Sequence, residues 1–258
     1  MAGVGLHNSN DRLTVCALAV IAMCAVTFAH EALGHGGACL LLGGHIEMLS
    51  SSIFRCGAHS GWIDPAGPGT NLLAGLIALA VRSAMPPGFA RTRLLLLLVT
   101  AFSFFWEGGY LMRAMILRDG DLYFFAQFMM GTPPLWMRAL GFLAGLAIYA
   151  FAIRTTSGAL VEMFDVREGR HVARIAWIAA TLAAGAAAFA FRGAPQWPDV
   201  RDALLEIGLA SVPLLLIPRA NAYAPQARAI VGRSWPLTAA AVVMFAAFVM
   251  TLGRGVSI

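Results

Sequence analysis

The sequence contains no lysine, and it has few charged residues of any kind. Its 18 basic residues are all arginine, and charged residues make up 12% of the chain. Soluble domains carry about 25% charged residues. A chain that is also 59% hydrophobic, with a mean hydropathy of +0.75, is therefore predicted to be an integral membrane protein. In a membrane protein a surplus of basic residues usually lies in the cytoplasmic loops, so the net charge of +5 does not indicate nucleic-acid binding.

Cysteine is also scarce. Cys16, Cys24, Cys39 and Cys56 form no C-x-x-C pair. Three of them lie in the first apolar run, where a free cysteine behaves as a small hydrophobic residue. We therefore predict neither a disulfide framework nor cysteine ligands for a metal. The first apolar run is too long for a signal peptide and lacks a clear small-residue cleavage site, so we expect it to be a membrane span.

Apolar runs of about 20 residues, the length that crosses a bilayer as a helix, recur along the chain. Because no repeat or low-complexity linker divides them, we predict one all-α polytopic membrane domain over residues 1–258, with six or seven helices. Residues 1–140 carry the unusual motifs, whereas residues 141–258 are predicted to be helical scaffold, with Gly141 and Gly145 suited to close helix packing. The predicted spans are 13–36, 69–85, 94–117, 137–154, 173–191, 203–218 and 236–253.

Arginines cluster after the second, fourth and sixth predicted spans. Since these loops alternate, all three clusters would lie on one side of the membrane, which the positive-inside rule assigns to the cytoplasm. We therefore predict a multi-pass protein of the bacterial inner membrane, with its N-terminus inside and its C-terminus outside. The clusters are Arg82, Arg91 and Arg93; Arg154, Arg167, Arg170 and Arg174; and Arg219, Arg228 and Arg233.

The most unusual stretch, residues 30–35 (HEALGH), closes the first predicted span. Ionisable residues inside a membrane segment are costly and usually functional. In zinc hydrolases two such histidines bind the metal and the glutamate is the base for its water, which here predicts His30 and His35 as ligands and Glu31 as base. The histidines stand five residues apart instead of four, so they meet only if the helix absorbs an extra residue as a π-turn, which Gly34 would ease. Two structural histidines bonded to neighbouring helices are the alternative.

A second motif follows the first span. Residues 45–64 mix isolated apolar residues with Ser, Gly and Arg and are predicted to form a short hairpin or re-entrant element. Residues 66–71 (AGPGTN) then open the second span. An HExxH-type motif, a hairpin and A-G-P-x-x-N in this order resemble the site-2 protease-type intramembrane zinc metallopeptidases. The resemblance implies that Pro68 and Asn71 lie beside the metal-bearing helix and position substrate. An ordinary helix start, with Pro68 in its first turn, is the alternative.

The third metal ligand is less clearly marked. A catalytic zinc usually has three protein ligands, and the family takes its third from an aspartate in a motif resembling N-x-x-P-x-x-x-L-D-G, which is absent here. Gly109-Tyr110, Gly120-Asp121 and Pro134-Leu135-Trp136 occur instead, in an order that resembles a divergent bacterial branch of these peptidases. That resemblance implies Asp121 as the third ligand, with Asp119 as second choice. A solvated acidic turn is the alternative.

Glu107 lies well inside a predicted span and competes with Asp121. We expect it to contact the ring nitrogen of a histidine ligand that faces away from the metal or, alternatively, to be the third ligand. A carboxylate paired with Arg113, without a role at the metal, is the other explanation. Glu206 needs no special role, because a helix N-terminus at the start of span 203–218 would favour a negative charge.

Together these features predict a membrane-embedded zinc metalloprotease that hydrolyses peptide bonds of a membrane protein or peptide in or near the bilayer. Two other classes remain open. One is an ion- or proton-coupled transporter that uses the buried histidines and acids, although no internal repeat of interrupted helices supports it. The other is a non-catalytic relative of the peptidase fold, which would bind little or no metal.

Overall fold

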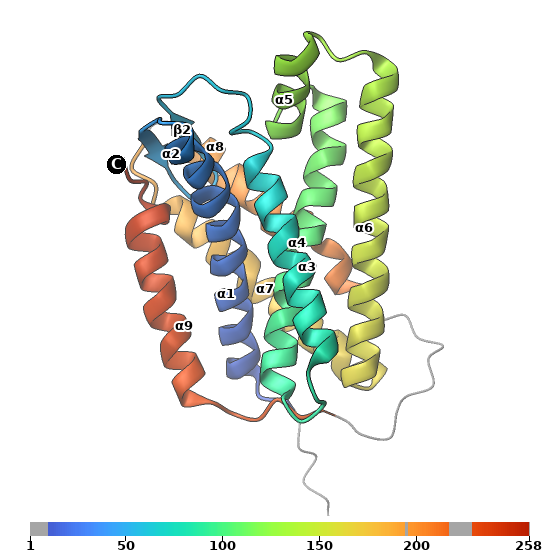
Figure 1. The fold of residues 1–258 in the computed structure, drawn as a ribbon. Helices are drawn as coiled ribbons and strands as arrows, with labels where there is room; N and C mark the ends of the chain where they lie inside the picture. Colours follow the sequence, from blue (N-terminus) through green and yellow to red (C-terminus); the bar gives the residue numbers. More distant parts are fainter. Residues whose placement is uncertain (1–9, 194–195, 217–228, 258) are drawn as a thin grey trace, which may run out of the picture.

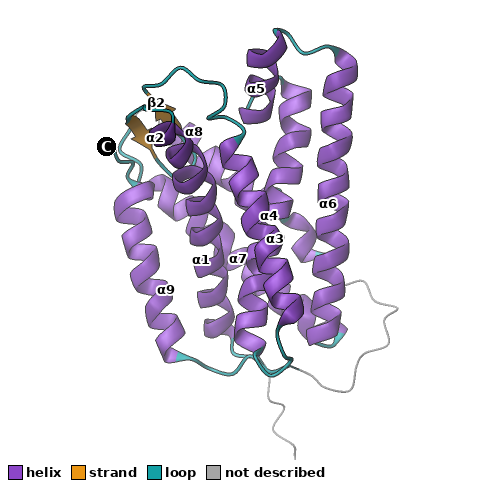
Figure 2. Ribbon diagram, viewed as in Figure 1, coloured by secondary structure: helices purple, strands orange, loops and turns teal. Residues whose placement is uncertain are grey.

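The computed structural model describes residues 10–193, 196–216 and 229–257 and is almost entirely helical (Figures 1 and 2). Five segments are long and apolar enough to cross a membrane: Arg12–Leu41, Ala90–Leu117, Leu135–Met163, Val166–Phe189 and Trp235–Gly253. The elements are α1 (Arg12–Phe28), the π-turn η1 (Ala29–Gly36), α2 (Gly37–Leu41), β1 (Ile46–Leu49), β2 (Phe54–Cys56), α3 (Ala66–Ala84), α4 (Ala90–Leu117), α5 (Asp121–Met130), α6 (Leu135–Met163), α7 (Val166–Phe189), α8 (Gln196–Ala203), the π-turn η2 (Leu204–Leu209), the 3-10 turn η3 (Val212–Leu215), α9 (Trp235–Phe248) and the π-turn η4 (Val249–Gly253).

These five helical segments are consistent with an all-α membrane protein and match five of the seven predicted spans. The predicted span 69–85 is the helix α3, which is not one of the five. Residues 203–216 do not form one long helix: α8 ends at Ala203, and a π-turn and a 3-10 turn follow. Pro213 explains part of this break, since proline cannot donate a helical hydrogen bond. Residues 217–218, together with Arg219 and Arg228, lie outside the described residues.

The helix α4 is central to the packing, with α3, α6 and α1 around it, and α7 and α9 pack against α1 (Figure 1). Small residues set the closest approach: a side chain on Gly145 would meet the backbone oxygen of Gly108 at 2.8 Å. The α4–α6 contact therefore depends on glycine at both positions. The prediction of close packing at Gly145 is confirmed, although its partner, Gly108, was not foreseen.

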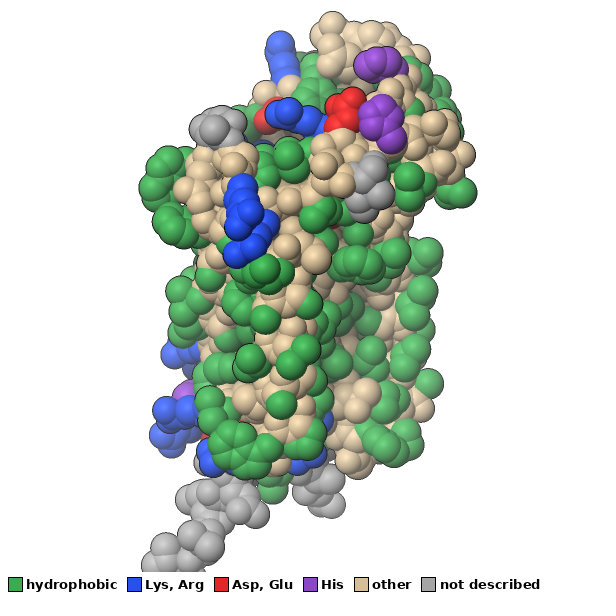
Figure 3. Space-filling view, turned by 90° about the vertical axis from the view of Figure 1, so that its left-hand side faces the viewer, with side chains coloured by type: hydrophobic (Ala, Val, Ile, Leu, Met, Phe, Trp, Pro, Cys, Tyr) green, Lys and Arg blue, Asp and Glu red, His purple; other side chains and the backbone are tan. Residues whose placement is uncertain are grey.

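The two ends of the bundle carry the charged side chains, and on the face in Figure 3 the band between them is largely uncharged. At the end away from the hairpin, Glu162 of α6 accepts hydrogen bonds from Arg82 of α3, at 2.6 Å, and from Arg93 of α4. Asp11 there caps α1 by accepting the backbone N–H of Thr14 at 2.9 Å. At this end the carboxylate of Glu162 therefore joins α3, α4 and α6.

The other end carries a two-stranded antiparallel hairpin of β1 and β2, which confirms the hairpin predicted within residues 45–64. A disulfide joins Cys39, in α2, to Cys56, in β2. The prediction that these cysteines stay unpaired was therefore wrong. The physical reason is that the chain turns back at Gly43, whose φ of +77° suits glycine, and brings β2 alongside α2.

Candidate metal centre

The π-turn η1 carries both histidines of the HEALGH stretch. Its wider winding lets residues five apart point to the same side, and the Nε2 atoms of His30 and His35 lie 3.2 Å apart. The predicted π-turn is therefore confirmed. Both side chains are at least 94% buried. The ring of Trp106 stacks on His30 at 4.5 Å between centroids, and that of Phe54 on His35 at 5.4 Å, so both imidazoles are fixed in orientation.

The second nitrogen of each histidine has an acceptor as its partner. His35 Nδ1 lies 2.9 Å from the backbone oxygen of Ile63, which can only accept, so Nδ1 carries the proton. His30 Nδ1 lies 2.8 Å from Glu107 Oε1 and donates to that carboxylate in the same way. In the neutral imidazoles, both Nε2 atoms then present lone pairs to one another, which is how metal-binding histidines are held.

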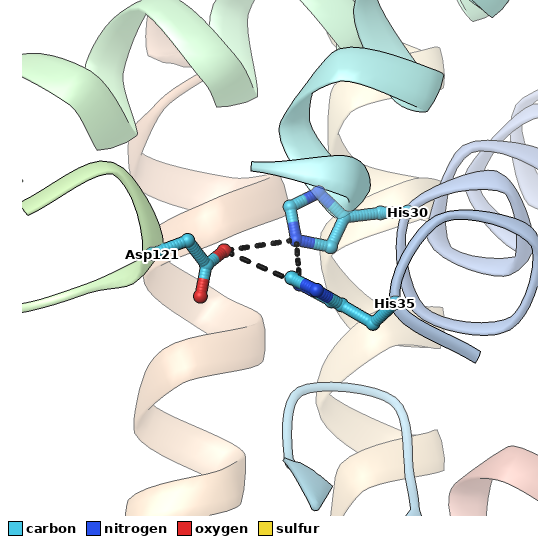
Figure 4. A group of neighbouring side chains, drawn as sticks. All are labelled: His30, His35 and Asp121. Atoms are coloured by element: carbon cyan, nitrogen blue, oxygen red, sulfur yellow. Dashed lines mark hydrogen bonds and ion pairs between the residues drawn. The ribbon is translucent and has the colours of Figure 1, made fainter. Parts of the chain in front are cut away.

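Asp121 completes the group from the first turn of α5 (Figure 4). Its Oδ2 lies 3.4 Å from His30 Nε2 and 3.3 Å from His35 Nε2. Burial opposes the ionisation of Asp121, but the bonds to the two histidines outweigh it and hold the pKa of this carboxyl well below its usual range. Tyr110 fixes the backbone there, since its hydroxyl accepts the N–H of Asp121 at 3.2 Å. The three predicted ligands thus converge on one point.

The triangle of two nitrogens and one oxygen has edges of 3.2, 3.3 and 3.4 Å. Protons alone do not satisfy it: one proton leaves a nitrogen lone pair facing the carboxylate, and two protons place the N–H groups of the histidines against each other. A cation at the centre satisfies all three contacts. Atoms about 2.0–2.1 Å from a tetrahedral zinc lie about 3.3–3.4 Å from one another, so these residues fit zinc with one position open.

Glu31 lies in the same π-turn and is 4% exposed. Its Oε2 is buried without a hydrogen-bond partner among the described residues. A buried carboxylate oxygen without a partner is costly. This orphaned acceptor beside the histidines is what the hydrolase interpretation requires of its base, which must have a free oxygen for a water proton.

Glu107 and Asn71 form a chain behind His30. Glu107 Oε1 accepts from His30 and also from Asn71 Nδ2, at 2.7 Å, while Asn71 Oδ1 accepts the hydroxyl of Ser103 at 2.8 Å. Glu107 therefore holds the back of the ligand, as predicted, and does not pair with Arg113, whose carboxylate partner is Asp202 at 3.8 Å. Asn71 is fully buried and is connected to His30 by two successive hydrogen bonds, through Glu107, so the contacts of its side chain are structural. Its predicted role toward substrate stays a prediction.

The AGPGTN stretch lies directly against the centre. A side chain on Gly67 would come within 2.3 Å of His35 Nε2, and one on Gly34 within 2.5 Å of the Gly67 backbone. Gly34 therefore permits the close approach of α3 to η1, and its predicted role in easing the π-turn stays a prediction. Pro68 is buried in the first turn of α3, where its missing N–H costs nothing. Gly67 was not singled out from the sequence, although the motif contains it.

Other acidic and histidine residues near these motifs lie away from the centre. Asp119 is exposed and does not belong to the group of His30, His35 and Asp121, so nothing in the geometry favours it as the third ligand and that second choice stays a prediction. His45 is 73% exposed and pairs with Glu47 at 3.8 Å. His59 is exposed in the loop that follows β2. Among the described residues, His30, His35 and Asp121 are the one group suited to hold a metal.

No protein family model, curated protein or solved structure matches this chain significantly.

Proposed function

We propose that the protein is a membrane-embedded zinc metallopeptidase in which His30, His35 and Asp121 hold the metal. The observation that carries this proposal is the triangle of metal-ligand atoms, each edge within 0.2 Å of the others, in which both imidazoles turn lone pairs inward. The order of the sequence motifs, which resembles that of site-2 protease-type peptidases, also supports the proposal. The substrate class is a membrane protein or peptide.

When bound, zinc supplies a Lewis acid that polarises a peptide carbonyl and acidifies water. The chain supplies the remaining chemistry. Glu31, with its free buried Oε2, takes the proton of the attacking water and returns it to the leaving amine nitrogen. Glu107, through Nδ1 of His30, keeps that imidazole oriented and raises its basicity as a ligand. Trp106 and Phe54 exclude water from the outer faces of the two rings.

The hairpin offers a place for an extended substrate. At the outer edge of β1, the backbone of Leu49 exchanges two hydrogen bonds with Val256, at 2.8 and 2.9 Å. The outer edge of β2 has no strand partner among the described residues, and Phe54 of β2 stacks on His35. A substrate strand pairing with β2 would therefore pass beside the metal centre.

The centre would face the non-cytoplasmic side of the bacterial inner membrane. Two observations support this orientation. Arg82 and Arg93 lie at the end of the bundle opposite the hairpin, where the positive-inside rule expects the cytoplasm. The Cys39–Cys56 disulfide lies at the same end as the metal centre, and disulfides persist in oxidising compartments.

Replacing Glu31 with glutamine tests the proposed chemistry. The amide keeps the size of the side chain but accepts no proton, so hydrolysis of a single-span reporter by protein in nanodiscs should fall by about 10²- to 10⁴-fold with zinc still bound. Cleavage at the wild-type rate by a zinc-loaded Glu31→Gln protein would refute the role of Glu31. A wild type that binds zinc and cleaves nothing would favour the non-catalytic alternative.

A further inference from the structure

Glu206 is a half-buried carboxylate for which the described part of the chain offers no hydrogen-bond or ion-pair partner. A helix N-terminus does not explain it, because α8 begins at Gln196 and continues directly into the π-turn that contains Glu206. A carboxylate left without a partner inside a helical membrane domain is costly unless it binds something.

The backbone around Glu206 is held by dedicated contacts. The indole N–H of Trp177 donates to the Gly208 oxygen at 2.8 Å, and the hydroxyl of Tyr149 donates to the Ala210 oxygen at 2.7 Å. These bonds satisfy carbonyl groups next to the irregular winding of η2. Such π-turns recur at functional sites, and η1 already carries the metal-binding histidines here.

Glu206 faces a cavity of about 330 Å³ between α4, α6 and η2. Its lining includes three aromatic rings, two leucines and the carboxylate: Trp106, Tyr110, Tyr149, Leu205, Leu209 and Glu206. Arg113 also reaches the wall, but its guanidinium lies 3.8 Å from Asp202 and over the ring of Tyr110. Aromatic faces with one carboxylate attract a cation on an apolar stem, and the volume suits a side chain of that kind.

The cavity lies next to the metal centre. Trp106, which forms one wall, stacks on His30, and Tyr110, which forms another, lies edge-on to His30 at 6.4 Å between centroids. The occupant of the cavity is thus one ring layer from a metal ligand. These centroid distances of 4.5 and 6.4 Å to His30 are about the length of two residues of an extended peptide, which rises about 3.3 Å per residue, so we place the subsite roughly two or three residues from the scissile bond.

We propose that this cavity is a specificity subsite that binds a lysine or arginine side chain of the substrate, with Glu206 as its counter-charge. The assignment of the cation to the substrate rests on the proposed peptidase function. The binding of an alkyl cation in the cavity does not.

The binding step is tested first, with n-hexylammonium and uncharged 1-hexanol as probes on the purified protein in maltoside micelles, followed by calorimetric titration. Saturable binding of the ammonium, at least tenfold tighter than that of the alcohol, is expected, together with a loss of at least tenfold in Glu206→Gln. Asp119→Asn, which removes an exposed acid outside the cavity, should bind like the wild type. Equal binding of the two probes, or an unchanged Glu206→Gln protein, would overturn the proposal.

The substrate step uses peptides that carry lysine, arginine or norleucine at each position within three residues of a mapped cleavage site. The wild type should cleave one lysine or arginine series with a kcat/KM at least tenfold above that of the norleucine series. Glu206→Gln should lose this preference while keeping its rate on the norleucine peptides. If cleavage itself is absent, the peptidase proposal fails, while the titration still shows whether the cavity binds an alkyl cation. Cleavage without a preference would show that its cation does not come from the substrate.

Discussion

A single added Cβ atom beside His35 would decide whether the proposed metal centre can form. Gly67 leaves the space next to His35 Nε2 empty, whereas a Cβ there would lie 2.3 Å from that nitrogen. Two residues further along, a Cβ on Gly69 would meet nothing within 4 Å. The same methyl group is therefore harmful at one position and harmless at the other, although both belong to the same turn of α3.

We predict that Gly67→Ala lowers zinc affinity at least tenfold because His35 must leave its position, while the protein stays folded. Gly69→Ala should keep zinc and gain up to about 1 kcal/mol in stability, the usual difference between glycine and alanine inside a helix. Zinc titration and thermal unfolding of both variants check this. Equal zinc affinity in the two variants would contradict the described contact.

In the proposed metal centre, Glu107 would act on the metal only through His30. Glu107→Ala removes the acceptor of the His30 Nδ1 proton, so zinc affinity should fall about 10- to 100-fold. Glu107→Gln, whose amide oxygen still accepts that proton, should recover most of the loss. Competition with a zinc chelator measures both affinities. If Glu107 were itself a zinc ligand, the glutamine variant would lose zinc as completely as the alanine variant.

At the scale of the elements, the hairpin is joined to the bundle in three places. The disulfide ties β2 to α2, Val256 pairs with Leu49 of β1, and Ser50 and Ser52 in the turn donate to Asp199 Oδ1 at 3.0 and 2.6 Å. Each contact comes from a different part of the chain. The position of β2 beside His35 is therefore set by tertiary structure and not by the hairpin alone.

Removing the disulfide in a Cys39→Ser, Cys56→Ser protein should lower stability by about 3 kcal/mol, the value expected for a closed loop of this length. Because the other two anchors remain, zinc should stay bound. Chemical denaturation in detergent, with non-reducing mass analysis of the wild type, measures the change. Two free thiols at these positions in the wild type would contradict the structure.

Asp199 makes the stability of this anchor depend on pH. Burial raises the pKa of Asp199 above its usual value of 3.8. A carboxyl with a raised folded-state pKa contributes stability below pH 3.8, and that contribution is lost as the pH rises through the folded-state pKa. Asp199→Asn can still accept both serine hydroxyls without this loss. The wild type should therefore lose stability relative to Asp199→Asn as the pH rises above about 4, in thermal unfolding series; parallel curves would refute it.

At the scale of the whole molecule, the disulfide and the candidate metal centre lie at one end of the bundle, and Arg82 and Arg93 lie at the other. In a background without Cys16 and Cys24, we predict that His59→Cys reacts with an impermeant maleimide on intact spheroplasts, whereas Gly88→Cys reacts only after lysis. Both positions are exposed, at opposite ends. The reverse labelling pattern would place the centre in the cytoplasm.

The sequence was sufficient to predict those parts of the fold and the candidate site that depend on a local pattern of residues. The five-residue spacing of His30 and His35 predicted the π-turn, and a glutamate inside an apolar span predicted that Glu107 lies behind a ligand. It was insufficient where partners meet only in the folded chain. The Cys39–Cys56 bond and the contact of Gly67 with His35 depend on how distant segments pack, which periodicity does not encode.

The most direct test of the metal centre is the zinc content of detergent-purified protein, measured for the wild type, His35→Ala, Asp121→Ala and Asp119→Ala. The structure predicts about one zinc per chain in the wild type and in Asp119→Ala, and a loss of zinc in the other two variants. A well-folded wild type without zinc, or an Asp121→Ala protein that keeps it, would contradict the proposed centre.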